Sequence, residues 1–391
     1  NKVYALFCVV GTAFTFVFII IMLQLVYDTT SNKAPFVNGD RTIVFNTFQD
    51  VNGRNVGGIY SGSTAWLMER IREKEDYFMY YNSVGEVAVN DVCKTFPFAF
   101  VNGGYWKVHQ FNFVEGRSFT EQECLNKDAY VVLREDMAET FFKSGHAVGQ
   151  KMEIQGRDYT VIGVVRNFST YATITEGIWI PYVFNSFSPR GFGHYNAGGI
   201  VGHYDLGVLF PRDVPVQNMK ESVVVAVKDY WRQINMNVDV KPENLYTFRE
   251  ARIDNFGSDL YAYGIPVAIL LLLLIPAINI VTLNMANVDN YSDEIALKRA
   301  LGAGLWDSFM QVISEIALLV IVGAILGIFL TYPIADWISG SFFNNGDEWQ
   351  VSLIENLDYL VILCGVFPLS LLFTLLSGGI PAYIIARKNI A

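Results

Sequence analysis

The sequence predicts an α-helical membrane domain of four transmembrane helices, with a large α+β extracytoplasmic domain inserted between the first and second helices. Three observations lead to this fold class. The 391-residue chain is 52% hydrophobic, which is too apolar for an ordinary soluble protein of this length. Four separate apolar runs are long enough to cross a bilayer, which takes about 20 helical residues. Finally, 23 of the 28 Lys and Arg residues lie between Asp28 and Phe256, outside these runs.

The four apolar runs are the predicted transmembrane segments. The first belongs to residues 1–27, and the others cover about 261–283, 309–338 and 357–385. The first run is longer than the apolar part of a signal peptide, about 7–15 residues, and has no clear cleavage site, so we expect it to be retained. Because residue 1 is Asn rather than Met, we also expect native sequence before it.

The short loops between these runs predict the orientation. If both termini are cytoplasmic, five basic residues share that side: Lys2, Lys298, Arg299, Arg387 and Lys388. The loop at 339–356 has no Lys or Arg and carries acidic residues. Because basic residues of short loops remain in the cytoplasm, we predict a multi-pass protein of the cell inner (cytoplasmic) membrane, with the large domain periplasmic or extracellular.

Residues 28–256 are numerous enough to form a core of their own, and we expect two lobes. Residues 244–262 are polar and helical in pattern, and they predict a rod that continues into the second span. Strand-like alternation and helical periodicity both occur in this domain, which predicts a mixed α+β fold. The strand patterns are at 41–48, 130–133 and 158–165, and the helical patterns are at 63–76, 134–143 and 215–233.

A short charged segment lies between the second and third spans, in the domain formed by residues 257–391. Ser292 can cap a helix at 293–301, with acidic residues in its first turn, and Gly302 stands where a left-handed C-cap belongs. A helix this short has no core of its own to bury against. We therefore predict that it contacts another protein, the alternative being a solvated cytoplasmic loop with a helical turn.

Two stretches resemble the MacB/FtsX-type permeases of ABC transporters, the type VII or mechanotransmission class. Glu294-Ile-Ala-Leu-Lys-Arg-Ala-Leu-Gly-Ala303 is similar to that family's EI-x-[IL]-[KR]-R-A-[LI]-GA signature. Val114-Glu-Gly-Arg-Ser-Phe-Thr120, followed by Ala147-Val-Gly149 and Tyr159-Thr-Val-Ile-Gly-Val-Val165, is similar to the GR-x-F…A-x-G…ViGVv pattern of the MacB-like periplasmic core. The resemblance covers nearly the whole chain.

The resemblance implies that helix 293–301 is a coupling helix that docks on a cytoplasmic ABC ATPase subunit. It also implies a dimer with a second permease copy or a paralogue, membrane lipids as surroundings and, for export, a periplasmic adaptor and an outer-membrane channel. The candidate ATPase-coupling residues are Glu294, Ile295, Leu297, Lys298, Arg299, Leu301, Gly302 and Ala303.

The sequence contains no G-x-x-x-x-G-K-[ST] phosphate-binding loop. We therefore expect a non-catalytic subunit that binds no cofactor itself, with ATP and Mg²⁺ bound by a separate ATPase chain. The four histidines show no metal-ligand spacing, so we expect no metal site. The net charge of -10 argues against nucleic acid as a partner.

The expected function is that of a permease subunit that transmits ATP-driven conformational change to its periplasmic domain. The cargo would be a peptide, antibiotic, lipopeptide or lipoprotein that is exported or extracted. The alternative is an FtsX-like transmembrane regulator that activates an extracytoplasmic cell-wall hydrolase. The size of the external domain favours transport.

A few single residues stand out within the predicted domains. Gly323 and Gly327 form a G-x-x-x-G in the third span, which permits close helix approach either within one subunit or in a dimer. Glu315 is an intramembrane carboxylate for which we favour a contact with water or the coupling helix over a proton relay. Cys93 and Cys124 lie outside the membrane, where a disulfide between them is an open alternative.

Overall fold

The computed structural model describes residues 2–50, 52–53, 55–89, 92–142, 146–169, 174, 176–185, 201–202, 204–233, 235, 237–254, 259–286, 304–343 and 353–387. The chain divides into two compact units. The helical unit contains Asn1–Asp28, Phe256–Asn345 and Gln350–Ala391, and the external unit contains Thr29–Asn255 and Gly346–Trp349.

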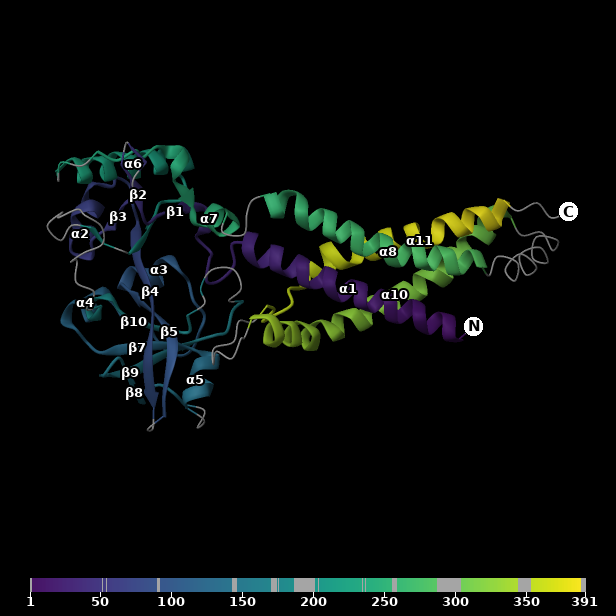
Figure 1. Ribbon diagram of the computed structural model, residues 1–391, viewed down its shortest axis with the longest axis horizontal. Coiled ribbons are helices and arrows are strands. Elements are labelled where there is room, and N and C mark those ends of the chain that lie inside the picture. The colour runs from purple at the N-terminus through teal and green to yellow at the C-terminus, as the bar shows by residue number, and fades with distance from the viewer. Residues whose placement is uncertain are drawn as a thin grey trace. The chain divides into compact units, whose positions relative to one another are not determined.

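Helices occupy all four of the predicted transmembrane segments (Figure 1). Two stretches are long and apolar enough to cross a membrane, Ala5–Thr30 and Phe309–Ser341, and two shorter apolar stretches are Ala262–Leu274 and Val361–Leu376. Both groups are identified among the described residues by length and composition alone, so membrane crossing by the four helices remains a prediction. The four helices are α1 (Lys2–Thr30), α8 (Ile265–Ala286), α10 (Leu305–Ile338) and α11 (Phe367–Arg387), with π-helical turns at Leu260–Gly264, Ser339–Phe343 and Val361–Val366.

Polar side chains within these apolar helices bond to their own backbone. The Thr12 hydroxyl donates to the Cys8 carbonyl at 2.6 Å, and the Thr331 hydroxyl donates to the Gly327 carbonyl at 2.8 Å. Both hydroxyls are buried. Because hydrocarbon offers no water as a partner, this bond to the preceding turn lets a threonine lie inside an apolar helix.

The core of the helical unit is built around α1. Phe16, Ile19 and Ile20 are completely buried and belong to a cluster that includes residues of α8, α10 and α11. Phe16 meets Phe373 of α11 edge to face, with ring centroids 6.1 Å apart. The first helix thus packs with helices that follow it by more than 200 residues in sequence.

The external unit is built on a ten-stranded mixed sheet with the order β13-β1-β12-β4-β5-β10-β7-β9-β6, and β8 beside β4 and β9. A smaller sheet has the order β11-β3-β2. The strands are β1 (Thr42–Phe45), β2 (Phe48–Gln49), β3 (Asn55–Ile59), β4 (Asp76–Val89), β5 (Val92–Val101), β6 (Phe113–Gly116), β7 (Tyr130–Arg134), β8 (Lys151–Ile154), β9 (Arg157–Val165), β10 (Ile178–Pro181), β11 (Val201–Gly202), β12 (Asp205–Leu209) and β13 (Tyr246–Thr247).

The long strand β4 lies in the middle of the large sheet. Asp76–Tyr80 pair with β12, Tyr80–Val89 pair with β5, and Val87 and Ala88 pair with β8. β4 therefore has paired strands along both of its edges. Thr29–Asn255 belong to one compact unit, and a division of that unit into two lobes stays a prediction.

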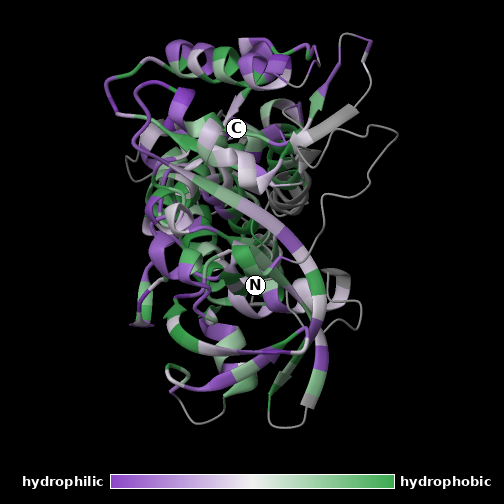
Figure 2. Cartoon of the chain, turned by 90° about the vertical axis from the view of Figure 1, so that its left-hand side faces the viewer, coloured by the Kyte–Doolittle hydropathy of each residue, from purple (hydrophilic) through white to green (hydrophobic). Residues whose placement is uncertain are grey.

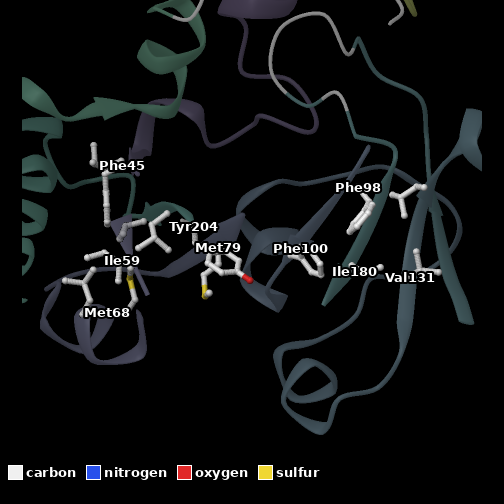
Figure 3. Packing of buried hydrophobic residues seen from close by; sticks show 14 of the residues in the cluster. Phe45, Ile59, Met68, Met79, Phe98, Phe100, Val131, Ile180 and Tyr204 are labelled. Carbon is white, nitrogen blue, oxygen red and sulfur yellow. The ribbon is translucent and has the colours of Figure 1, made fainter. Parts of the chain in front are cut away.

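Both faces of the large sheet are covered by apolar side chains. Successive residues point to opposite faces of a strand, and Phe78 and Met79 accordingly belong to different core clusters. Figure 3 shows members of the larger cluster, with Met79, Phe98 and Phe100 from β4 and β5 lying among residues from other strands. The smaller cluster lies on the face that carries Phe78, and it contains residues of α3.

Six helices accompany these strands. The helix predicted for 215–233 is confirmed by α6, on which hydrophilic and hydrophobic residues alternate around the helix at the top of Figure 2. The bounds are α2 (Ser61–Arg70), α3 (Gly103–Val108), α4 (Glu121–Asn126), α5 (Glu135–Phe141), α6 (Val216–Gln233) and α7 (Phe248–Asp254), with 3-10 turns at Gly39–Arg41, Tyr182–Phe184 and Pro242–Asn244.

The predicted rod at 244–262 begins later than expected. Tyr246 and Thr247 are extended and pair with Val44 and Ile43 of β1, so the helix α7 starts only at Phe248. Strand pairing to β1 has overridden the helical pattern at these positions. Residues 255–258 lie outside the described part of the chain, so the continuity of the rod stays a prediction.

Candidate functional site

The predicted coupling helix at 293–301 lies outside the described residues, together with all eight of its candidate contact residues. Of the elements next to it, α8 ends at Ala286 and α10 begins at Leu305. The Gly304 backbone N–H donates to the Asp307 carboxylate at 2.8 Å, which caps the start of α10. Contact between residues 293–303 and an ATPase stays a prediction.

The G-x-x-x-G of α10 packs on α1 of the same chain. A Cβ placed on Gly323 would lie 2.8 Å from the Thr12 Cβ, and one on Gly327 would lie 3.0 Å from the Ala13 carbonyl oxygen. These separations are shorter than normal van der Waals contacts, so only glycine lets the two helices approach this closely. Of the two alternatives for this motif, packing within one subunit is the one that the structure contains.

Glu315 lies on an exposed part of α10. Its carboxylate accepts a long hydrogen bond from the Gln311 side-chain amide, at 3.4 Å. The two residues are one helical turn apart. A contact between Glu315 and the coupling helix involves undescribed residues and stays a prediction.

Cys93 and Cys124 are both free thiols, so the disulfide between them is not formed. Cys93 is exposed and pairs with Ala88 at the end of the β4–β5 hairpin. Cys124 is completely buried in α4, where burial raises the pKa of its thiol well above the ordinary value. The two side chains belong to different environments, one in solvent and one in the core.

The external unit contains a cleft of about 600 Å³ that no local motif in the sequence indicates. It is lined by residues of β1 and β2, by β4, α3 and β12, and by a segment that ends in α7. The lining residues come from positions between 44 and 254. Because the strands and helices that hold them are brought together only by the fold, sequence reasoning could not find this site.

Aromatic side chains form much of the cleft wall. Phe78 of β4 lies near Tyr105 of α3, with ring centroids 5.9 Å apart, and Phe248 of α7 lies 6.1 Å from Phe78. His109 stands among them, with its ring centroid 4.7 Å from that of Phe78 and 4.4 Å from that of Tyr105. Rings from three separate elements thus meet at the cleft.

His109 is uncharged at neutral pH. Burial lowers its pKa to about 3, opposed by the hydrogen bond between Nδ1 and the Tyr105 carbonyl and assisted by the positive charge of Arg252. An imidazole that stays neutral contributes an aromatic surface and no positive charge to the cleft.

Arg252 is completely buried at the cleft. Its guanidinium carbon lies 4.1 Å from the centre of the Phe36 ring, and one terminal nitrogen donates to the Ser31 carbonyl at 3.5 Å. A cation over an aromatic face is stabilised by the ring's electrons. The guanidinium therefore ties α7 to the segment that follows α1.

Three carboxylates also line the cleft: Asp205, Asp239 and Asp254. Asp205 of β12 lies directly opposite Tyr80 of β4 in the strand register. Burial, opposed by a hydrogen bond from Asn46 and assisted by the charge of Glu176, raises the pKa of Asp205 to about 6. Asp205 is thus a half-buried carboxylate whose charge changes near neutral pH.

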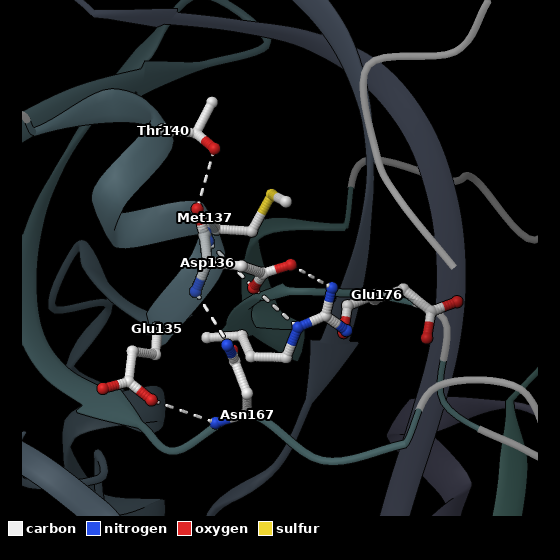
Figure 4. A network of polar contacts seen from close by, with 7 residues as sticks. Glu135, Asp136, Met137, Thr140, Asn167 and Glu176 are labelled. Atoms are coloured by element: carbon white, nitrogen blue, oxygen red, sulfur yellow. Dashed lines mark hydrogen bonds and ion pairs between the residues drawn. The ribbon is translucent and has the colours of Figure 1, made fainter. Parts of the chain in front are cut away.

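A polar network holds the segment that carries Glu176 (Figure 4). The buried guanidinium of Arg134 makes two hydrogen bonds to the Asp136 carboxylate, at 2.7 and 2.6 Å, and donates to the Glu176 carbonyl at 3.4 Å. The Asp136 backbone N–H donates to the Asn167 side chain at 3.1 Å. Three separate segments of the chain are joined by this network.

Among the residues that the structure describes, no group of three or more His, Cys, Asp and Glu could hold a metal ion.

Comparison with known proteins gives matches to two family models. Residues 5–236 match the model of the MacB-like periplasmic core domain, and residues 266–390 match that of the FtsX-like permease C-terminal domain. The first match alone covers more than half of the chain.

Curated relatives match with low identity. The macrolide export ATP-binding/permease protein MacB of Chromobacterium violaceum is 24% identical over 297 residues, which cover 74% of this chain and 42% of that protein. The uncharacterized ABC transporter permease YknZ of Bacillus subtilis is 22% identical over 290 residues, 72% of this chain and 65% of that protein. The chain therefore spans less than two thirds of the length of either relative.

Among solved structures, the periplasmic region of MacB from Actinobacillus actinomycetemcomitans is similar at 16% identity with a TM-score of 0.43. The similarity covers 56% of this chain and 94% of that one.

Proposed function

Since the chain belongs to the MacB/FtsX-type permeases of ABC transporters, we propose that it transmits ATP-driven movement from a separate cytoplasmic ATPase to its external domain. It would thereby export or extract a peptide, antibiotic, lipopeptide or lipoprotein. The relatives named above are permease components of ABC transporters. The proposal extends that family membership to a role and a class of cargo.

The observation that carries the proposal is the order of the two family matches along one chain. A MacB-like periplasmic core comes first, and an FtsX-like permease domain follows it. The external domain is joined to the membrane domain at each of its ends, by α1 and by the segment after α7. Two covalent connections of this kind would let a movement of the membrane helices reach the external domain. The MacB-like core favours export or extraction over activation of a cell-wall hydrolase.

The membrane topology belongs to the same proposal. The basic residues of the short segments favour cytoplasmic termini, which leaves the external unit outside an inner membrane. The coupling helix at 293–301 would then be cytoplasmic. It would bind the ATPase through Ile295 and Leu301, with Lys298 and Arg299 fixing its register by charge.

The partners follow from this arrangement. ATP and Mg²⁺ would be bound by the ATPase chain, and a second permease copy or a paralogue would complete the dimer. A periplasmic adaptor and an outer-membrane channel would serve export across a second membrane. Support for a separate ATPase comes from YknZ, which is named a permease, whereas MacB is named an ATP-binding/permease protein.

The direct test is substitution in the coupling helix. We expect Leu301→Asp to reduce co-purification of the ATPase, and ATP turnover of the complex, by roughly tenfold or more, because a carboxylate would have to be buried in an apolar groove. Leu125→Asp is the matched control, since Leu125 is 58% exposed on α4 of the external unit. Undiminished complex formation and turnover in Leu301→Asp would refute the proposal.

A further inference from the structure

We propose that the cleft in the external unit binds an amphiphilic organic cation, with Asp205 as the counter-ion and the partly exposed rings of Tyr80 and Phe248 as the surface for its apolar body. This inference goes beyond ATP-driven movement. The lining residues all belong to the external unit, so binding requires neither the ATPase nor the coupling helix.

The size and lining of the cleft suit a small molecule. Its volume of about 600 Å³ lies within the range of about 300–1,000 Å³ that is typical of ligand pockets. The walls combine aromatic rings with a few polar groups, and that combination orients a ligand while burying its apolar surface. Several of the rings are themselves buried against the core, which holds the wall in place.

The charge of the lining selects a cation. The lining residues include three carboxylates and one guanidinium. The Asp239 carboxylate also lies 3.7 Å from the Lys241 ammonium, so these groups together carry one more negative than positive charge. The guanidinium of Arg252 already lies over the Phe36 ring and donates to the Ser31 carbonyl. His109 adds no positive charge, because burial keeps it neutral. An anionic ligand would therefore meet excess negative charge, whereas a cationic ligand would be attracted.

Of the three carboxylates in the lining, Asp205 should gain the most from binding a cation. It is less accessible to water than Asp239 and Asp254, which are exposed. Glu176 is buried and close enough to Asp205 to disfavour its negative charge. A bound cation would relieve this repulsion and replace part of the lost solvation. The ring of Tyr80, which is only partly buried and lies opposite Asp205 in the strand register, can stabilise the same positive charge through its face.

The experiment compares two hydrophobic ions of the same shape and opposite charge. Tetraphenylphosphonium is the cation, tetraphenylborate is the anion, and binding is measured by equilibrium dialysis with the full chain in nanodiscs of zwitterionic lipid. Empty nanodiscs give the uptake by lipid, which is subtracted. We expect saturable binding of the cation, and affinity lower by about tenfold in Asp205→Asn, because one partly buried charge pair is lost.

A second cleft variant and two controls complete the test. Asp254→Lys places a positive charge at the C-terminal end of α7, where a helix tolerates it well, and it should also weaken binding of the cation. Asp158→Asn and Asp158→Lys are the controls, because Asp158 is an exposed residue of β9 that does not line the cleft. Both controls should bind as wild type does.

Three results would overturn the inference. They are equal affinity of Asp205→Asn and wild type, equal affinity of Asp254→Lys and wild type, and binding of tetraphenylborate as tight as that of the cation. If Asp205→Asn does not fold, the Asp254→Lys measurement decides. Because no ATPase is present, a negative result here leaves the coupling proposal to its own test.

Discussion

Gly323 of α10 lies directly against Thr12 of α1: a Cβ on Gly323 would stand 2.8 Å from the Thr12 Cβ and 3.1 Å from the Val9 carbonyl oxygen. The helix that begins the chain is therefore locked to one that starts some 300 residues later in the sequence. A rigid contact of this kind would let α1 and α10 move as one body during transport.

Replacing Gly323 should destabilise the helical unit. Gly323→Ala forces the helices apart or distorts Thr12, which we expect to lower the free energy of unfolding in detergent by about 1–3 kcal/mol. Gly11→Ala is the control, because Gly11 lies in α1 with nothing within 4 Å of the added methyl group. A change in oligomeric state with unchanged stability would instead assign the motif to a dimer contact.

The Arg134–Asp136 pair should be important for the stability of the external unit. Asp136→Ala leaves a guanidinium whose side chain is only 3% exposed without its bidentate partner. We expect a loss of about 3 kcal/mol, at the low end for a broken buried pair because Asp136 is partly solvated. The free energy of unfolding of the full chain, followed by tryptophan fluorescence, measures this effect.

The control for that prediction is Asp229→Ala. Asp229 lies 3.7 Å from Arg70 in an exposed pair, so its removal should cost less than about 1 kcal/mol. Equal effects of the two substitutions would show that burial of Arg134 does not matter for stability.

The capping box at the start of α4 predicts a dependence of stability on acid. Hydrogen bonds from Arg117 lower the pKa of Glu123 from 4.5 to about 2, with help from Thr120. A carboxyl whose pKa is lowered by folding stabilises the fold above its unfolded pKa, and that contribution is lost as pH falls toward the folded value. The stability difference between wild type and Glu123→Gln should therefore be largest near neutral pH and shrink between pH 4.5 and about 2.

Glu139→Gln serves as the control for this titration, because Glu139 is exposed on α5. Its stability difference from wild type should stay small at every pH. A constant difference for Glu123→Gln over the same range would contradict the role assigned to its carboxylate.

Cation binding in the cleft should weaken in mild acid. Burial raises the pKa of Asp205 to about 6, with Glu176 adding to the shift and Asn46 opposing it. Below that pH the carboxyl is protonated and neutral, so affinity for tetraphenylphosphonium, whose own charge is permanent, should fall as pH drops from 7 to 5. Equilibrium dialysis at each pH follows this change. In Asp205→Asn the profile should be flat over this range, and an unchanged slope in that variant would exclude Asp205 as the titrating group.

Thiol labelling tests both the redox state and the side of the membrane. Exposed Cys93 should react with a membrane-impermeant maleimide added to cells whose outer barrier is opened, while buried Cys124 should react only after unfolding. Because Cys364 is also exposed, the measurement is made in a Cys364→Ser background. There, Cys93→Ser should lose the signal, and reducing agent should not alter migration on a gel. Labelling of Cys93 only after reduction would show that it is paired.

Several features of this protein could be predicted from short stretches of sequence. Helices lie at all four apolar runs, and β7, β9 and α6 lie close to the ranges expected from their patterns. The turn at Gln155 and Gly156 has positive φ at both positions, as a tight hairpin requires. These features depend on neighbouring residues, because hydrophobic period and turn chemistry act over a few positions.

Other features depended on contacts between distant residues. The sequence by itself determined where the apolar helices lie and which motifs mark the family, since length, period and local residue types are sufficient for both. Only the tertiary structure decided that Gly323 packs on α1, that Cys93 and Cys124 are separated, and that residues from β1 to α7 enclose a cleft. The physical reason is that packing across the whole fold selects the partner of each buried surface. The hydrophobic periodicity of a short stretch does not indicate that partner.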